Sequence, residues 1–453
     1  MSLGLHWVTL IKIPIYYHSC NYMSTKTFFI LFSALSFSPL IPAKEYSPKT
    51  SNIPIKANDF FVSFDSDINK LILKVMFFLW IFTLNVKKTI YFSKNNKLFL
   101  FIIIFALWLL ATCIFTFNLS YPYEGFIKYF VLPILIISTT IKKEHLKYVV
   151  SAFLVGIFIN ELISYGIYFE IIQHQFLGFN IVGNKNNPVP FMPSHMEYTL
   201  FLSFSIIISI YSIFKVKSKY LKLLLIFFTI TMITNLFLTT GRTGQFTLLG
   251  ALIFLIIIYF RHNYKYIIFS ILSIIFIFLT AFFFSDNVNN RLKQGYSDIV
   301  KVIKYKDYNT SFGIRLSSYT IIEEIIKNDD FNILYGLGYS RTNELIQKIQ
   351  IQKIGEFMQN QKGHLHNSYI TIFAGTGFVG LAIFMIIWYK IFSIKIEDKY
   401  FNYIRYAFLF VFFLAGFTEN IFRQKEVMML SAIFISIIII LSTKYFKNEE
   451  DIC

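Results

Sequence analysis

Cysteine is scarce in this sequence. The chain of 453 residues has three, Cys20, Cys113 and Cys453, and no two of them form a C-x-x-C pair. Their wide spacing and odd number argue against a disulfide framework and against a thiolate metal site.

Charged residues are also few. They make up 15% of the chain, whereas a soluble globular protein carries roughly 25%. Hydrophobic residues reach 56%, and the mean hydropathy is +0.59. This balance excludes an ordinary cytosolic enzyme, a disordered chain and a fibrous protein, because so little polar surface forces the side chains into lipid. The sequence therefore predicts a polytopic membrane protein.

The formal net charge of +17 does not indicate a nucleic-acid partner. Basic residues of a nucleic-acid-binding domain gather on one face. Here they lie in short tracts between apolar runs, which is typical of the loops that orient a membrane protein.

A membrane-spanning helix needs about 20 mostly apolar residues. We predict an all-α fold with twelve such helices, at 27–43, 71–86, 98–117, 124–141, 146–171, 196–214, 221–240, 243–260, 265–284, 368–394, 402–420 and 427–445. The chain then divides into a cytoplasmic segment 1–26, nine helices within 27–284, a large periplasmic loop 285–367, three helices within 368–445 and a cytoplasmic tail 446–453. Translation could start at Met1 or at Met23, and the sequence leaves both alternatives open. The apolar run after Lys26 is expected to be an uncleaved first helix rather than a signal peptide.

The distribution of basic residues predicts the orientation. With both termini in the cytoplasm, the short inner segments hold 18 Lys and Arg residues. The short outer segments hold eight: Lys185, Arg242, Arg423 and Lys425, and in the first of these segments Lys44, Lys49, Lys56 and Lys70. Cytoplasmic loops are enriched in Lys and Arg, so this orientation is favoured. It places loop 285–367 outside, where its apolar content, including Tyr319, Ile322, Ile325 and Ile326 at helical spacing within 317–327, predicts an ordered, partly helical cap.

Two arginines on the predicted outer side are candidates for binding phosphate. Arg242 lies in the tight turn TTGRTGQ between two spans, and Arg315 lies in SFGIR within the large loop. Guanidinium groups pair with phosphate oxygens, and the glycines beside Arg242 are expected to let a ligand approach the backbone. The alternatives are an arginine that reaches toward lipid headgroups and a solvated loop arginine.

The segment GHLHNS before the tenth span offers His364 and His366. A histidine there can act as a general base near pH 7. A metal site needs a third ligand, and none is evident nearby. The alternative is a helix cap formed by Asn367 or Ser368. Asp65 and Asp67 form a D-x-D pair that can hold a divalent cation, and a further set could line an outward cavity: His195, Glu197, Glu419, Asn420 and Arg423.

The stretch HNSYITIFAGTGFVG, with Gly377 and Gly380 after His366 and Asn367, resembles the signature of the O-antigen ligase and O-antigen polymerase superfamily. The turn around Arg242, the segment around Arg315 and LYGLG at 334–338 look like the corresponding parts of that family, over about 235–385. Gly241 departs from the family, which often has serine there.

The resemblance implies an inner-membrane glycosyltransferase that moves a glycan from undecaprenyl diphosphate to the lipid A-core oligosaccharide, without a nucleotide or other cofactor. His366, Arg242 and Arg315 would be catalytic, and Arg242, Arg315, His364, Asn367 and Arg341 would bind substrate, with no metal. A repeat-unit polymerase has the same chemistry and stays open as an alternative. A flippase or other transporter is less favoured, because transporters usually place charges near the bilayer midplane.

Overall fold

The computed structural model describes residues 86–116, 125–172, 175–176, 179–181, 183–190, 194–273, 286–339, 342–361 and 363–443. Almost all regular structure in these ranges is helical, which confirms the predicted all-α membrane fold. The predicted span at 27–43 and nearly all of that at 71–86 lie outside the described residues, as do Asp65 and Asp67.

Eight helices in the described ranges are long and apolar enough to cross a membrane. They are α4 (Lys97–Phe115), α7 (Leu146–Tyr168, preceded by η3, Lys143–His145), α8 (His195–Lys215), α9 (Lys219–Leu238), α10 (Arg242–Phe260), α15 (Ser368–Ser393), α16 (Lys399–Thr418) and α17 (Lys425–Ser442). Two shorter apolar segments, η2 with α6 (Ile127–Val131, Leu132–Thr140) and Tyr264–Ser273, overlap two more of the predicted spans. The total of twelve stays a prediction.

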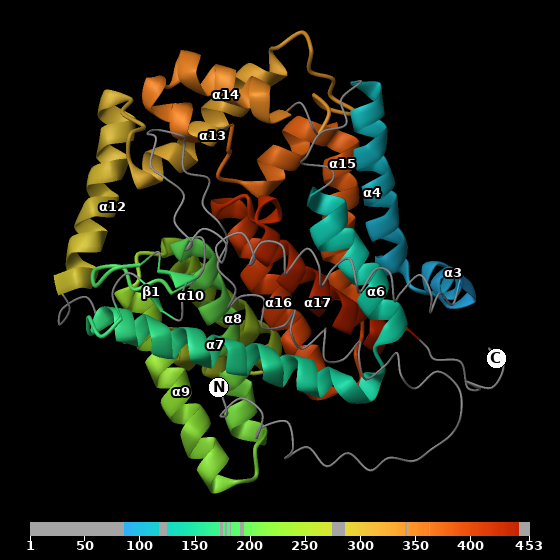
Figure 1. The fold of residues 1–453 in the computed structure, drawn as a ribbon, viewed down its shortest axis with the longest axis vertical. Coiled ribbons are helices and arrows are strands. Elements are labelled where there is room, and N and C mark those ends of the chain that lie inside the picture. Colours follow the sequence, from blue (N-terminus) through green and yellow to red (C-terminus); the bar gives the residue numbers. More distant parts are fainter. Residues whose placement is uncertain are drawn as a thin grey trace, which may run out of the picture.

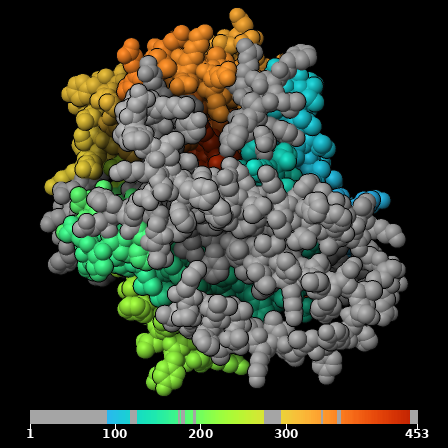
Figure 2. Space-filling model, in the orientation of Figure 1, coloured from blue at the N-terminus to red at the C-terminus, as the bar shows by residue number. Residues whose placement is uncertain are grey.

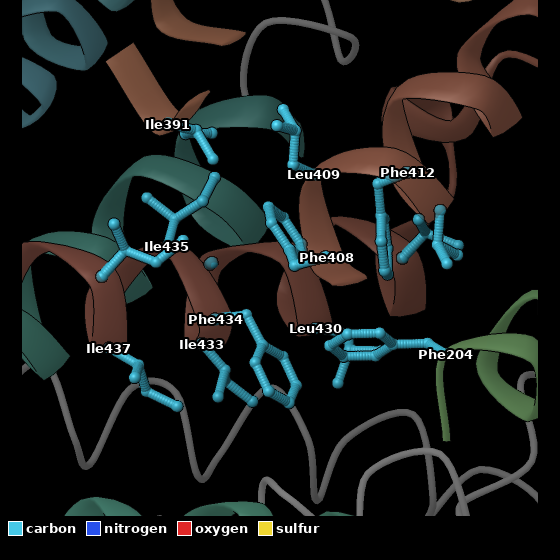
Figure 3. Packing of buried hydrophobic residues seen from close by; sticks show 14 of the residues in the cluster. Phe204, Ile391, Phe408, Leu409, Phe412, Leu430, Ile433, Phe434, Ile435 and Ile437 are labelled. Carbon is cyan, nitrogen blue, oxygen red and sulfur yellow. The ribbon is translucent and has the colours of Figure 1, made fainter. Parts of the chain in front are cut away.

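Aromatic side chains of α8, α16 and α17 pack together at the centre of the bundle (Figure 3). The ring centroids of Phe204 and Phe434 lie 4.6 Å apart, and so do those of Phe408 and Phe412. The first pair is edge-to-face, with an interplanar angle of 82°, and the second is tilted, at 31°. Aromatic pairs in favourable geometry contribute about 0.5–1.5 kcal/mol beyond the area that they bury. The many phenylalanines of the sequence therefore form the core between helices as well as the lipid-facing surface.

The outer face of the bundle is apolar and several inner positions are polar. On α9, Leu223, Phe227 and Ile230 are exposed, whereas Asn235 on the same helix and Ser203 on α8 are fully buried. The Ser203 hydroxyl donates to the carbonyl of Gly244 at 2.7 Å. Exposed apolar helix faces are stable in a bilayer, where helices satisfy their own backbone hydrogen bonds. The surface thus agrees with a chain that spans a membrane.

Polar side chains join the helix ends at the side predicted to face the cytoplasm. Asn96, the N-cap of α4, donates to Ser442 and Thr443 at the end of α17. Arg405 of α16 is 2% exposed and donates to the carbonyls of Ile391 and Phe392, near the end of α15. The last carbonyls of a helix lack partners within that helix, and basic side chains can satisfy them.

The helices of the large loop form a cap at one end of the bundle, opposite the end from which α9 projects (Figures 1 and 2). This cap consists of α12 (Asp286–Tyr305), α13 (Ser311–Ile326), α14 (Thr342–Lys353) and η4 (Glu356–Gln361), and its small core contains Ile321, Ile325, Ile346, Met358 and Leu365. The described chain also contains α3 (Val86–Asn95) and the short strands β1 (Gln175–Phe176) and β2 (Phe179–Asn180). The side of the membrane that the cap faces stays a prediction.

The apolar face expected within 317–327 was partly wrong. Ile325 is buried as predicted, but Tyr319 is 55% exposed and Ile326 is 48% exposed. Ile321 is fully buried instead, one turn before Ile325. Helix α13 also begins earlier, at Ser311, where Thr310 caps it by accepting from the backbone N–H of Gly313.

Candidate active site

Arg242 is the first residue of α10, at the end of the bundle that the cap covers. Its guanidinium lies 3.5 Å from the carboxylate of Asp298 on α12, and its side chain is 36% exposed. The contact is long for a charge-assisted hydrogen bond, which is usually 2.7–2.9 Å. Arg242 therefore keeps part of its donor capacity accessible at the start of the helix, where the backbone dipole also favours anions.

The glycines beside Arg242 do not serve the purpose that the sequence suggested. A Cβ atom at Gly241 or at Gly244 would collide with Thr199 of α8, and at Gly241 also with the carbonyl of His195 at 2.8 Å. The space next to these glycines is filled by α8 and not by a route for a ligand. Their absent side chains let the start of α10 pack closely against α8, which fixes where Arg242 stands.

Arg315 is the fifth residue of α13 and reaches the end of α16. Its Nε donates to the carbonyl of Thr418 at 3.2 Å, and its Nη2 lies 2.7 Å from Oε1 of Glu419. A third contact runs from Nη1 to the carbonyl of Ser311 at 2.6 Å. The side chain is 24% exposed, so this arginine is fixed by contacts on several sides.

His366 lies in the loop between η4 and α15 and meets the same carboxylate. Its Nδ1 is 2.8 Å from Oε2 of Glu419, and its backbone N–H donates to Ser318 of α13 at 3.1 Å. An ionised carboxylate can only accept, so Nδ1 carries a proton and donates to it, and Nε2 is the nitrogen with which a neutral ring would accept a proton. This is the arrangement that a general base requires.

The environment of Glu419 keeps it ionised. Burial alone would raise the pKa of Glu419, but the hydrogen bond and charge of His366, followed by the charge of Arg315, outweigh burial and lower this pKa below its ordinary value. Glu419 is 4% exposed. A buried carboxylate is stable only when it is paired in this way.

His364 is the second ring beside Glu419. Its ring centroid lies 4.3 Å from that of His366, and its Nε2 is 4.0 Å from Oε2 of Glu419, with no hydrogen-bond partner among the described residues. Burial, together with the neighbouring His366, lowers the pKa of His364 to about 3, so the ring is neutral at ordinary pH.

The expectation that the two histidines lack a third ligand was wrong. One ligand atom each from His364, His366 and Glu419 lie within 4.8 Å of one another, although Glu419 is 53 residues beyond His366. Two imidazoles and a carboxylate are ligand types that Zn²⁺ uses. Arg315 already pairs with the same carboxylate at 2.7 Å, and its positive charge opposes the entry of a second cation.

Asn367 and Ser368 start α15 and fix it to the end of α16. The side-chain oxygen of Asn367 accepts from the N–H groups of Tyr369 and Ile370 at 2.9 and 3.0 Å, so the helix-cap alternative is confirmed for this residue. Ser368 donates to the carbonyl of Glu419 and accepts from the N–H of Ile421. Asn367 is 3% exposed, and its visible role is to hold the helix that follows His366.

The described contacts bring the three predicted catalytic residues to one end of the bundle. Arg315 and His366 share Glu419. Thr243, next to Arg242, lies 3.5 Å from Thr418 through their hydroxyls, and the carbonyl of Thr418 accepts from Arg315. Arg341 lies outside the described residues.

The polar residues that were expected to line an outward cavity have different roles in the structure. Asn420 and Arg423 line a pocket, as expected, and Glu419 belongs to the cluster described above. Glu197 instead closes a capping box with Ser194 at the start of α8. No local pattern indicates that Asp298 of α12 pairs with Arg242 of α10, because 56 residues separate them in the sequence.

Residues 227–385 match a family model described as O-antigen ligase. This stretch, about a third of the chain, is therefore similar to the O-antigen ligase family. No curated protein matches the chain. The matched region contains Arg242, Arg315, His364 and His366, whereas Glu419, which joins the last three, lies beyond it.

The glycines of the segments that resemble the O-antigen ligase signature are required by the local backbone and packing. Gly377 has φ 65° and ψ −168°, a conformation that essentially only glycine adopts, and a Cβ atom there would overlap the backbone of Leu334. A Cβ at Gly380 would overlap Thr376 and approach Trp108 of α4 to 3.0 Å. Gly336 and Gly338 have φ of 70° and 83°. The two glycine-containing segments thus pack against each other and attach the cap to α15.

Proposed function

We propose that this protein is an inner-membrane O-antigen ligase, which transfers a glycan from undecaprenyl diphosphate to the lipid A-core oligosaccharide on the periplasmic side. The observation that carries the proposal is the chain of contacts Arg315–Glu419–His366, with His366 2.8 Å from the shared carboxylate. Arg315 and His366 lie within the family match, and the three residues lie at the end of a membrane bundle, where a lipid-linked diphosphate would lie.

His366 would remove the proton of the acceptor. The acceptor hydroxyl attacks the anomeric carbon of the donor glycan, its proton passes to Nε2 of His366, and the anomeric C–O bond breaks to release undecaprenyl diphosphate. Glu419 holds the ring by its Nδ1–H and stabilises the imidazolium that forms. A positioned base of this kind contributes roughly 10²–10⁴-fold to the rate. One displacement of this type inverts the anomeric centre.

Arg242 would contribute more than Arg315 to stabilising the negative charge that develops on the diphosphate. Fixed donors aimed at a developing anion are commonly the largest single term in catalysis. Arg242 is more exposed than Arg315, and its contact with Asp298 is the longer of the two ion pairs, at 3.5 Å against 2.7 Å. Arg242 can therefore turn to a phosphate at lower cost, whereas Arg315 both orients Glu419 and offers its remaining N–H groups.

No metal is needed in this scheme. The guanidinium groups neutralise the phosphates, and Arg315 neutralises Glu419. The test is transfer in vitro from a lipid-diphosphate glycan to purified core acceptor, with and without EDTA. We expect equal rates in both. Loss of activity with EDTA and its recovery with Zn²⁺ would contradict this scheme and favour the His364–His366–Glu419 metal cluster.

His366→Ala and Arg242→Ala should each lower transfer by at least about a hundredfold while the protein still inserts into the membrane. Glu419→Gln, which keeps the shape but removes the charge, should lower kcat more than it raises the KM of either substrate. Glu323→Gln is the matched control, because this glutamate is 66% exposed on α13 and pairs only with Lys327 among the described contacts. A wild-type rate of transfer in His366→Ala would show that His366 is not the general base.

A repeat-unit polymerase is the second candidate, because the same groups would serve it with a lipid-linked glycan as acceptor. A deletion strain distinguishes the two. Accumulation of long lipid-linked glycan with none attached to the core indicates a ligase, whereas attachment of a single repeat unit indicates a polymerase.

A further inference from the structure

A pocket of about 190 Å³ lies next to the His366–Glu419 cluster. We call it the η5 pocket, after the turn η5 (Ile421–Arg423) that forms one wall. The residues that matter here are Tyr129, Tyr339, Thr371, Asn420, Arg423 and Lys425. A cavity of roughly 150 Å³ already admits a six-membered ring, so this pocket can take one sugar residue.

The η5 pocket and the proposed base share their walls. Asn420 of the pocket directly follows Glu419, which binds His366. Thr371 of the pocket lies one turn into α15 and donates to the carbonyl of Asn367, the residue after His366. A ligand in the pocket is therefore held close to the group that receives the proton.

The pocket is positively charged. Arg423 and Lys425 both line it and are exposed, and its lining contains no aspartate or glutamate. After the first outer segment, the short outer segments hold four basic residues in the predicted orientation, and Arg423 and Lys425 are two of them. Because outer segments are generally depleted of basic residues, this pair is a candidate for binding an anion. Lys425 Nζ lies 5.7 Å from the ring centroid of Tyr129, so one of the two charges lies beside an aromatic wall of the pocket.

The other lining groups suit a sugar. The apolar C–H face of a pyranose packs on aromatic rings, and the pocket offers Tyr129 and Tyr339. Burial raises the pKa of Tyr339 to about 12, so its hydroxyl stays neutral. Asn420 and Thr371 add an amide and a hydroxyl, groups that fix the orientation of a polar ligand.

We propose that the η5 pocket binds a sugar residue of the acceptor glycan that carries a phosphate or a carboxylate, and so places the acceptor hydroxyl against His366. This inference rests on the proposed transferase function. The acceptor is favoured over the donor because the donor diphosphate is assigned to Arg242 at the start of α10. In Figure 1, α10 and α6 lie on opposite sides of α16 and α17, and Tyr129 belongs to η2, directly before α6.

Binding tests the pocket without any need for transfer. The full chain in lipid nanodiscs is titrated with glucose 6-phosphate, glucuronic acid, methyl glucoside and inorganic phosphate, and binding is followed by saturation-transfer NMR. We expect both charged sugars to bind at least about tenfold more tightly than methyl glucoside, a difference of roughly 1.4 kcal/mol. Arg423→Gln and Lys425→Gln should each remove most of this preference.

Lys327→Gln is the control, because Lys327 is a basic residue of the cap that is 59% exposed and pairs with Glu323 and Glu324. Equal binding of charged and neutral sugars, or wild-type binding in both pocket variants, would overturn the proposal. Inorganic phosphate that competes as well as glucose 6-phosphate would show a simple anion site, such as one for a lipid headgroup, and would overturn the sugar part.

Transfer assays separate this inference from the proposed function. Removal of phosphate from the acceptor by phosphatase should raise its KM about tenfold in the wild type and leave it unchanged in Arg423→Gln, with the KM of the donor unaffected. If the wild type is active but its KM for the acceptor is the same with and without the phosphate, the proposal for the pocket is contradicted and the proposed function is not. A wild type inactive with every acceptor would contradict the transferase, while the binding experiment would still decide the pocket.

Discussion

Glu419 is the residue on which the arrangement of the site depends. It binds Arg315 from the cap and His366 from the loop before α15, and it lies itself at the end of α16. Removal of one partner from a buried ion pair costs about 3–5 kcal/mol, because the other charge is left unpaired. Three segments that are distant in the sequence thus depend on one carboxylate for their mutual position.

Residue-scale electrostatics also give a pH prediction. The pKa of His364 is about 3 in the folded protein against an ordinary value of 6.5. As the pH falls below 6.5, the unfolded chain takes up a proton at this residue and the folded chain does not, so stability is lost by up to about 1.4 kcal/mol per pH unit. Above pH 6.5 the residue contributes no pH dependence.

We therefore expect the melting temperature of the protein in nanodiscs to fall between pH 7 and pH 5, and to fall less in His364→Gln. The lowered pKa of Glu419 has its effect at more acid pH, since it loses its charge only as the pH falls below its ordinary value of 4.5. Identical melting profiles for the wild type and His364→Gln would show that the ring is not buried in the neutral form.

At the scale of the elements, the break in α15 connects the membrane bundle to the cap. The N–H of Phe378, just after the break at Gly377, donates to the carbonyl of Ile333 at 2.8 Å, and the N–H of Leu337 donates to the carbonyl of Ala374 at 2.9 Å. A straight helix would use these groups within itself. The break frees them to bind the loop that leads to α14.

Gly377→Ala should therefore be far more damaging than an ordinary helix substitution. The alanine would be strained at φ 65°, and its Cβ would overlap the backbone of Leu334. We expect a loss of about 2 kcal/mol or more in stability and a matching loss of transfer. The measurement is thermal unfolding and in vitro transfer of the purified variant.

Gly295→Ala provides the matched control. Gly295 lies within α12, and a Cβ there meets nothing within 4 Å. Alanine is the better helix former by about 1 kcal/mol, so this variant should be as stable as the wild type or slightly more so. Similar effects of the two substitutions would mean that the break at Gly377 is not required.

Several elements were predictable from the sequence for a physical reason. An apolar run of about 20 residues indicates a membrane-spanning helix without any knowledge of tertiary contacts. The predicted spans 98–117 and 196–214 therefore correspond closely to α4 and α8. Contacts between residues that are distant in the sequence do not follow from a local pattern. The ion pair between Arg315 and Glu419 joins residues that are 104 positions apart, so spacing in the sequence could not predict it. The packing of Gly241 on Thr199 could not be predicted from spacing either.

At the scale of the whole molecule, the site, the η5 pocket and the cap all lie at one end of the bundle, at the start of α10, α15 and α17 and the end of α16. The opposite end holds the basic turns, including Lys215, Lys217 and Lys219. Since basic residues are retained in the cytoplasm, this separation predicts that the cap faces the periplasm. A lipid-linked glycan would then be accessible only after it has crossed the membrane.

Labelling of single cysteines tests this orientation. In a background without the natural cysteines, Tyr296→Cys on α12, where the side chain is 73% exposed, should react with a membrane-impermeant maleimide in intact spheroplasts. Lys217→Cys, in the exposed turn between α8 and α9, should react only after permeabilisation. The reverse pattern would place Arg242, Arg315 and His366 in the cytoplasm, where a glycan already moved to the periplasmic leaflet is out of reach, and would exclude the transfer proposed for them.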